Sequence, residues 1–160
     1  FNLPFFWYNY KEVMKLKTNR AITREKAMTI LYQLFLYNKN NITYDLADII
    51  TEVIADTDSN EKTKIDSPFL KDIINGVINN QKDIDIYIRK YMTNWDIERL
   101  GPTDQAIIRI AVYELVYTDT PNLVCINESI EIAKKYSDDK VVKMINGVLD
   151  KIYHEEEENG

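Results

Sequence analysis

Glycine and proline are scarce in this chain, and that scarcity limits the folds open to it more than any other feature. The 160 residues contain four of each. A sandwich or barrel of short strands needs many tight turns, which these two residues supply, whereas helix interiors disfavour both. Hydrophobic residues make up 45% of the chain, which is enough for a real core. The sequence therefore predicts an all-α fold.

Apolar residues recur at helical spacing in seven segments, so we expect about seven helices. Thr23 is the predicted N-cap of the first, and Asn40 and Asn41 are expected to end it. Asp66 or Ser67 is the predicted cap of the third, with Pro68 in its first turn. Ser137 or Asp138 is the predicted cap of the last helix. The predicted helices cover about residues 23–38, 43–56, 67–78, 80–93, 103–117, 124–136 and 138–152.

The chain divides into three parts by composition. Residues 1–18 form a leader or a basic arm, and Met14 is one candidate for the true start of the protein. Residues 155–160 form an acidic tail. Between them, residues 19–154 are expected to form a single helical domain of two subdomains, at about 19–79 and 80–154.

The net charge of −6 is distributed unevenly. Residues 11–39 hold seven basic against two acidic residues, and residues 150–160 hold five acidic against one basic residue. Such a distribution steers an anionic partner toward the basic end. The chain contains no apolar run of membrane-spanning length, and its single cysteine, Cys125, fits a reducing compartment. We expect a cytoplasmic protein.

The basic residues near the N-terminus are the candidate binding site. Lys15, Lys17, Arg20 and Arg24 can neutralise the phosphates of a nucleic acid. Tyr32, two helical turns after Arg24, could stack on an unpaired base. The alternative interpretation is a solvated, charged start to a helix, with Tyr32 half-buried in the core.

Enzymatic chemistry has little support in the sequence. The chain has no glycine-rich phosphate loop, serine nucleophile elbow or HExxH segment. Cys125 and His154, the only cysteine and histidine, are too few for a zinc site. We expect no catalytic residue, no metal and no cofactor.

Several polar and small residues are interpreted as structural. Arg109 is expected to pair with another helix, for example at Glu128, and Asp83 and Asp85 to lie on a solvated face. A group of small and amide residues is predicted to serve helix packing, namely Gly76, Asn127, Asn146 and Gly147.

Four segments together resemble the NusB-type transcription antitermination factors. They include RIAVYEL, followed by INESIEIAK and INGVLDKI, and the resemblance covers about residues 19–152. Any one of these motifs alone would be weak evidence, but their order and spacing are specific. The full segments are residues 20–36, 69–77, 99–115 and 121–152.

The resemblance implies seven helices in two small subdomains, and a non-enzymatic role. It implies binding of a short boxA RNA together with the ribosomal protein NusE, within the RNA polymerase complex that reads through terminators during ribosomal RNA synthesis. The arginine-rich start of the family matches Arg20 and Arg24 here, and its functional tyrosine matches Tyr32. An acidic residue on the RNA side of the family matches Asp104.

The chain also departs from the family pattern. Ala21 and Ile22 interrupt the arginine-rich start, and Val141 or Val142 occupies a position that is usually small and polar. Two alternative functions stay open. One is a homodimeric interaction protein that covers its RNA face, and the other is the RNA-binding domain of an RNA cytosine methyltransferase.

Overall fold

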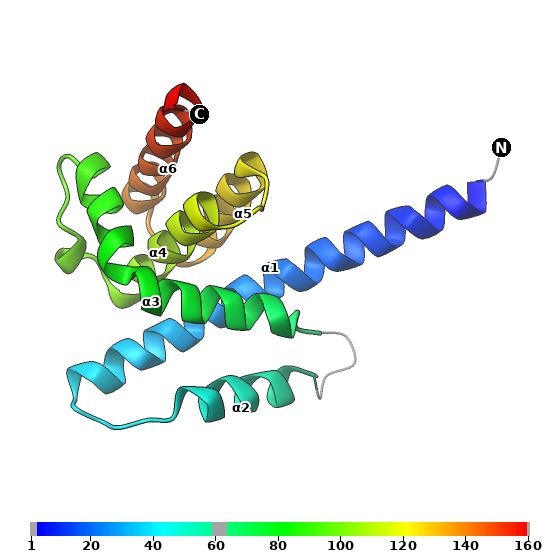
Figure 1. The fold of residues 1–160 in the computed structure, drawn as a ribbon, viewed down its shortest axis with the longest axis horizontal. Coiled ribbons are helices and arrows are strands. Elements are labelled where there is room, and N and C mark those ends of the chain that lie inside the picture. The colour runs from blue at the N-terminus through cyan, green and yellow to red at the C-terminus, as the bar shows by residue number, and fades with distance from the viewer. Residues whose placement is uncertain (1–2, 59–63, 160) are drawn as a thin grey trace.

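The fold is described from a computed structural model, which gives the backbone of residues 3–58 and 64–159 and the side chains of residues 19–57 and 64–155. Over this part of the chain every regular element is a helix, as predicted for an all-α fold, with six α-helices and one short 3₁₀ helix (Figure 1). The elements are α1 (Leu3–Lys39), α2 (Leu46–Asp58), α3 (Ser67–Tyr91), η1 (Ile97–Arg99), α4 (Pro102–Tyr117), α5 (Asn122–Tyr136) and α6 (Asp139–Asn159).

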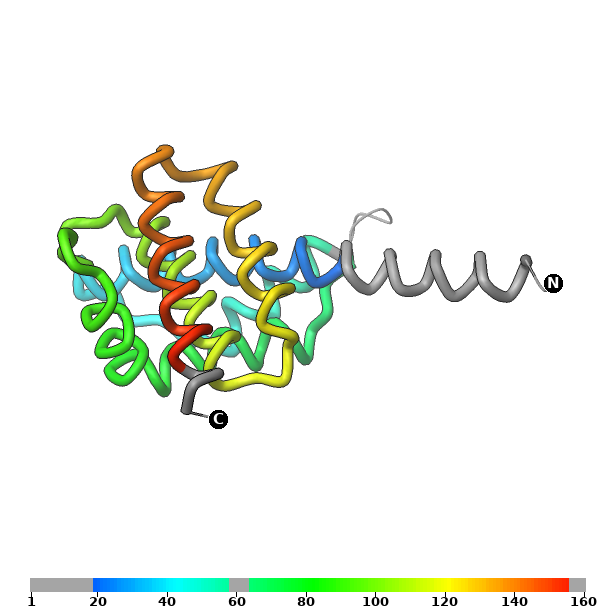
Figure 2. The backbone as a smooth tube through the Cα atoms, turned by 90° about the horizontal axis from the view of Figure 1, so that it is seen from above, coloured from blue at the N-terminus to red at the C-terminus, as the bar shows by residue number. Residues whose placement is uncertain are grey.

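Helix α4 lies at the centre of the molecule. It contacts α1, α3, α5 and α6, and nearly all of its residues from Gln105 to Leu115 are buried. Helix α1 runs the length of the molecule, with α4, α5 and α6 on one side and α2 on the other (Figure 1). Figure 2 gives the view from above, in which α5 and α6 lie side by side. The buried apolar side chains of both halves form one continuous core cluster.

Two of the predicted helix boundaries are wrong. Thr23 does not cap a helix but lies inside α1, where its hydroxyl donates a hydrogen bond to the Asn19 carbonyl oxygen at 2.6 Å. The helices predicted at 67–78 and 80–93 are one continuous helix, α3, because no glycine or proline interrupts the chain between them. The expected subdomain boundary near residue 80 therefore falls inside a helix.

Other helix termini follow the sequence signals. Asp66 caps α3 by accepting a hydrogen bond from the Phe69 amide at 3.1 Å, and Pro68 lies in the first turn. Asp138 accepts in the same way from the Val141 amide at the start of α6. Helix α1 ends as expected before Asn41, which adopts a left-handed backbone conformation with φ of 55°. Asparagine tolerates that conformation better than most residues.

Gly76 allows a close contact between α3 and α4, as predicted. A Cβ atom at this position would overlap the ring of Tyr113 on α4. The Tyr113 hydroxyl donates a hydrogen bond to Asp72 at 2.9 Å, which fixes the ring over the glycine. Burial, with a smaller contribution from Asp72, raises the pKa of Tyr113 to about 12. The tyrosine therefore remains neutral and donating at physiological pH.

We expect Gly76→Ala to lower the free energy of unfolding by about 1–3 kcal/mol, because the added methyl group displaces the Tyr113 ring. Without this clash, replacing glycine by alanine inside a helix would raise the free energy of unfolding by up to about 1 kcal/mol. Gly147→Ala is the matched control, since a Cβ there meets no atom within 4 Å. Urea denaturation of both variants tests the contact, and an equal gain in stability for both would contradict it.

Candidate nucleic-acid interface

The basic arm is part of α1 in this structure and does not lead into the helix as a separate segment. Helix α1 begins at Leu3, well before the predicted start near residue 23. The side chains of Lys15 and Lys17 lie outside the described residues. The site is therefore built from Arg20 onward.

Arg20 lies at the junction between α1 and the start of α3. Its Nε atom is 3.6 Å from Asp66 Oδ2, and its guanidinium carbon is 4.5 Å from the centre of the Phe69 ring. The Asp66 amide donates to the Thr23 hydroxyl at 3.0 Å, which holds the two helices together here. The side chain of Arg20 is 46% exposed, so one face of the guanidinium remains accessible to a phosphate.

Arg24 does not face solvent, which corrects the expectation that it contacts RNA beside Arg20. It is 2% exposed, and its guanidinium makes two hydrogen bonds to the carboxylate of Glu114 on α4, one of them at 2.9 Å. Burial lowers the pKa of Arg24, but the hydrogen bonds and charge of Glu114 outweigh that effect and raise it. Arg24 is a charged structural residue that joins α1 to the central helix.

Tyr32 is 39% exposed, on the same face of α1 as Glu25, two helical turns away. Glu25 accepts a hydrogen bond from Lys135 at the end of α5, with an Nζ–Oε1 distance of 3.0 Å. This hydrogen bond raises the pKa of Lys135. The neighbouring Tyr136 is 44% exposed, and its ring centre lies 5.2 Å from the ammonium group of Lys135.

Lys135 and Tyr136 extend the candidate surface beyond the residues found from sequence. A lysine beside a tyrosine in the segment KKYSDD was the available signal, but only the fold brings the end of α5 against α1. Together with Tyr32 they give two partly exposed aromatic rings and a cation across one helix junction. Such a combination suits stacking on bases and contact with a nucleic-acid backbone.

Asp104 belongs to this region because it contacts the end of α5. It lies in the first turn of α4, and its carboxylate accepts a hydrogen bond from the hydroxyl of Ser137, directly after Tyr136. The contact holds the last turn of α5 against the start of α4. Asp104 therefore helps to position Tyr136.

Arg20 and Tyr32 lie on different sides of α1. Twelve residues separate them, which places them about 120° apart around the helix axis and about 18 Å apart along it. Arg20 faces the start of α3, whereas the face of Tyr32 adjoins α5 through Glu25. A ligand that contacts both must cross the helix.

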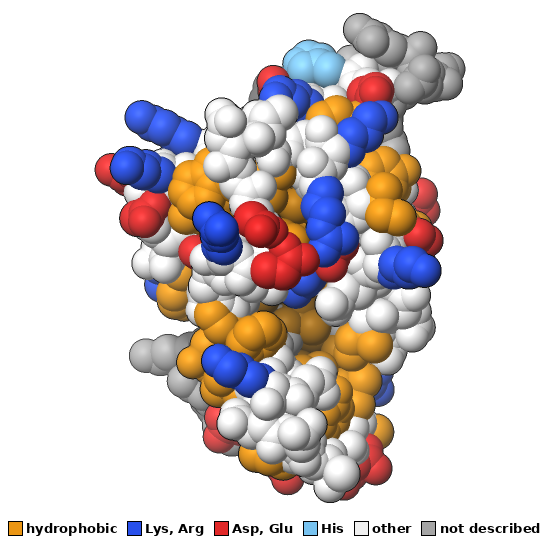
Figure 3. Space-filling view, turned by 90° about the vertical axis from the view of Figure 1, so that its left-hand side faces the viewer, with side chains coloured by type: hydrophobic (Ala, Val, Ile, Leu, Met, Phe, Trp, Pro, Cys, Tyr) orange, Lys and Arg blue, Asp and Glu red, His pale blue; other side chains and the backbone are white. Residues whose placement is uncertain are grey.

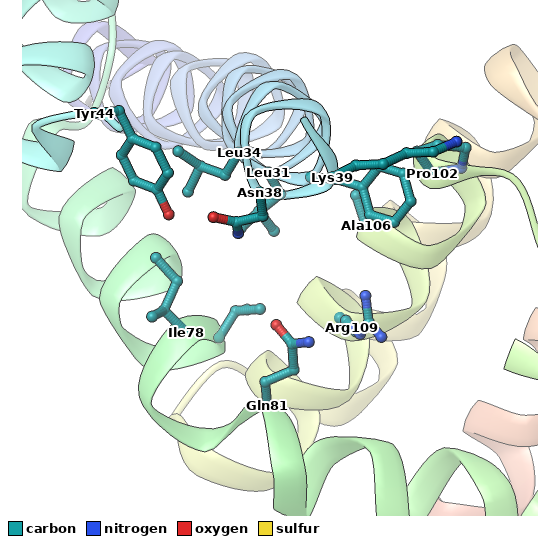
Figure 4. A pocket seen from close by; sticks show the side chains of 12 residues that line it. Leu31, Leu34, Asn38, Lys39, Tyr44, Ile78, Gln81, Pro102, Ala106 and Arg109 are labelled. Atoms are coloured by element: carbon teal, nitrogen blue, oxygen red, sulfur yellow. The ribbon is translucent and has the colours of Figure 1, made fainter. Parts of the chain in front are cut away.

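A second feature is an apolar groove between the end of α1, the loop after it, α3 and α4. Its cavity volume is about 530 Å³, and side chains from these elements surround a common space (Figure 4). On the surface, hydrophobic side chains gather in a hollow across the middle of one face (Figure 3). Tyr44 and Ile78 are the exposed apolar residues that line it, at 38% and 39%.

Arg109 lines the same groove, but its charge is already compensated. It donates to Asp85 through two nitrogens at 2.9 and 3.1 Å, and to Gln105 at 3.1 Å. The suggested pairing with Glu128 is therefore wrong, and so is the expectation that Asp85 lies on a solvated face, because it is 8% exposed. Both residues belong to the α3–α4 packing.

Two further expectations concern buried and small residues. Cys125 is fully buried, as predicted, with its sulfur 3.4 Å from the Ala111 carbonyl oxygen, and burial raises the pKa of its thiol. Asn127 and Asn146 are exposed, so they do not lock the packing as predicted. Gly147 faces open space instead of a close helix contact.

Within the described residues, no three histidine, cysteine or acidic side chains are grouped as a metal site would require. None of the helices in that part of the chain combines the length and the apolar character of a membrane span. The candidate surfaces are thus the junction of α1 with α5 and α3, and the apolar groove.

The fold and its surfaces define a class of small all-α proteins in which a long first helix carries basic and aromatic residues beside an apolar groove. A model described as the NusB family matches residues 21–154. The chain belongs to the NusB family, which confirms the resemblance seen in the sequence.

Relatives and solved structures agree with this assignment. The transcription antitermination protein NusB of Clostridium botulinum (strain Alaska E43 / Type E3) is 43% identical over 84% of this chain and 97% of the relative. That of Bacillus subtilis (strain 168) is 38% identical over 83% and 93%. The structure of T. maritima NusB has a TM-score of 0.68 at 31% identity, covering 83% of this chain and 89% of that one. The crystal structure of antitermination factors NusB and NusE in complex with dsRNA has a TM-score of 0.66 at 26% identity, covering 85% and 96%.

Proposed function

We propose that this protein is a non-enzymatic transcription antitermination factor that binds boxA-type RNA together with NusE and promotes ribosomal RNA transcription in the RNA polymerase complex. The names of its relatives support the antitermination role, and these relatives are not named as enzymes. A related structure that contains NusB, NusE and RNA supports the two partners. In this role the protein works in the cytoplasm.

The observation that carries the RNA proposal is the junction of α1 and α5. Tyr136 lies beside Lys135 there, and Tyr32 lies two turns after Glu25, the partner of Lys135; both rings are partly exposed. Exposed rings next to a cation favour unpaired bases, since every base offers a face for stacking. Arg20, Lys15 and Lys17 would contact phosphates along α1, and Asp104 would hold the end of α5 in place. Arg24 is left out of the contact set because it is buried against Glu114.

Replacing Tyr32 by alanine tests this surface. We expect about a fivefold loss of affinity for boxA-like RNA, at the lower end of the 1–3 kcal/mol that stacking contributes per base. With about three phosphates engaged, the logarithm of affinity should fall with that of salt at a slope near −2, and Arg20→Ala should reduce the slope by about 0.7. Tyr117→Ala is the matched control, because Tyr117 is equally exposed, at 39%, but lies at the far end of α4. If Tyr32 and Tyr117 variants bind RNA alike, the junction is not the site.

We further propose that the apolar groove receives the protein partner. Its lining is largely aliphatic and aromatic, and exposed apolar surface rimmed by polar groups is typical of protein interaction sites. Placing NusE there leaves the α1–α5 junction free for RNA. The alternative occupant of this groove is a second copy of the chain, and Ile78→Asp distinguishes the two because Ile78 lines the groove.

A further inference from the structure

A small pocket lies between the end of α3, the loop before η1 and α6, and it shares no lining residue with the apolar groove. Its volume is about 160 Å³, below the range of about 300–1,000 Å³ typical of pockets for whole ligands. It suits a single ring system with an attached group. The pocket is lined by Tyr91, Met92, Thr93, Asn94, Trp95, Lys143, Met144, Gly147, Val148 and Lys151.

The aromatic residues of the pocket are incompletely partnered. Trp95 is 40% exposed, which is unusual for so large an apolar side chain. The hydroxyl of Tyr91 is buried and makes no hydrogen bond to any described residue. Buried tyrosine hydroxyls normally have a partner. A ligand with a flat face could stack on the exposed part of the Trp95 ring, whereas the Tyr91 hydroxyl is closed off from solvent.

The charge of the lining is positive. Lys143 and Lys151 lie two turns apart on α6 and both are exposed, and the lining contains no acidic residue. Lys90, the residue before Tyr91 on α3, is already paired with Glu155 at 3.1 Å. The two pocket lysines are thus the cations that an anionic ligand would meet.

Gly147 keeps the pocket open. It lies inside α6, where glycine is costly relative to alanine, yet a Cβ there would touch nothing within 4 Å. Helix packing therefore does not require this glycine. Any larger side chain would extend into the pocket lined by Trp95 and the lysines.

We propose that this pocket holds one nucleotide of an RNA strand that continues beyond the α1–α5 junction, with its base against Trp95 and its phosphates near Lys143 and Lys151. The inference rests on the proposed RNA-binding function and adds a second contact to it. A stacked base and two charge contacts match the aromatic and basic lining. An apolar peptide would leave both lysines unpaired.

The two tryptophans of the chain are Trp7 and Trp95, so Trp7→Phe makes Trp95 fluorescence a direct reporter of the pocket. In this background we would titrate a short boxA-like RNA and the same RNA extended by a few nucleotides at either end. We expect one extended RNA to quench Trp95 and to bind about fivefold tighter than the short RNA, as one added stacking contact predicts. Gly147→Leu should abolish both the quenching and the gain while leaving affinity for the short RNA unchanged.

Lys151→Gln provides a second variant that keeps the pocket volume. It should reduce the salt slope of the extended RNA by about 0.7, whereas Lys82→Gln, an exposed lysine on α3 outside the pocket, should not. Equal binding of short and extended RNA with unchanged Trp95 fluorescence would overturn the pocket proposal and leave the proposed function intact. Quenching by free uridine monophosphate at the same concentrations would assign the pocket to free nucleotides and overturn it too. Absence of binding to any RNA would overturn both proposals.

Discussion

Glu114→Ala is expected to lower the free energy of unfolding by about 3–5 kcal/mol, the usual cost of removing one partner of a buried ion pair. Glu114 is fully buried, and its carboxylate compensates the guanidinium of Arg24, which is 2% exposed. Without it, the arginine must remain buried with its charge uncompensated or leave the core and disrupt the contact between α1 and α4. Urea denaturation followed by circular dichroism measures the loss.

The double variant Arg24→Met/Glu114→Leu tests whether that loss comes from an isolated buried charge or from the missing contact between α1 and α4. Replacing both charges by apolar groups of similar size removes the pair without leaving an isolated charge, so we expect a much smaller destabilisation. Lys135→Ala is a useful contrast, because its ion pair with Glu25 is exposed and should contribute about 1 kcal/mol or less. A loss below about 1 kcal/mol for Glu114→Ala would show that the pair does not join the two helices.

Ile78→Asp is expected to weaken binding of NusE by at least about thirtyfold, corresponding to the 2 kcal/mol or more of an interface hot spot. Ile78 lines the apolar groove from α3 and is 39% exposed, so a carboxylate there would meet a desolvated partner surface. Because the side chain is already partly in water, the free protein should keep its fold. Titration calorimetry with purified NusE measures the effect.

Ile86→Asp is the matched control for this experiment. Ile86 is also an exposed isoleucine on α3, at 56%, but it does not line the groove. If both variants bind NusE as the unchanged protein does, the partner docks elsewhere. If Ile78→Asp instead abolishes self-association measured by light scattering, the groove is a dimer interface of this chain.

The sequence was sufficient for several local features of the fold, although not for the start of α1 or the continuity of α3. Helix periodicity and capping residues are properties of short segments, so Asp66, Asp138 and Asn41 could be assigned from their neighbours alone. Gly76 could be recognised as a close-contact position, because glycine destabilises a helix interior and its presence there indicates that a larger side chain would not fit. The identity of its partner, Tyr113, required the fold.

The errors at the candidate site share a cause, which is the influence of residues distant in sequence. Arg24 has the composition of a phosphate-binding residue, but Glu114, which is 90 residues away, draws it into the core. Its neighbours in sequence predict that Asp85 lies on a solvated face, but in the fold it is buried against Arg109. Tyr136 belongs to the candidate surface because the contact of Lys135 with Glu25 brings the end of α5 against α1, which the sequence does not show. Charge patterning therefore identifies the basic segment of the chain but not which of its side chains face solvent.

The surface that we propose for RNA is more aromatic and less arginine-rich than the sequence suggested. Arg20 and Tyr32 lie about 120° apart around α1, so a strand that contacts both must pass over the helix. The α1–α5 junction, with Tyr32, Lys135 and Tyr136, lies on one side of that path. The affinity for unpaired RNA should depend on stacking at this junction as well as on charge.

The central claim is that this chain binds boxA-type RNA together with NusE. It is tested most directly by comparing the affinity for a boxA-like RNA with that for a scrambled RNA of equal length and composition, with and without NusE, at fixed salt. We predict that boxA-like RNA binds at least about tenfold tighter than the scrambled RNA, a difference of 1.4 kcal/mol, and that NusE increases the affinity further. Equal affinity for the two RNAs in the presence of NusE would contradict the claim.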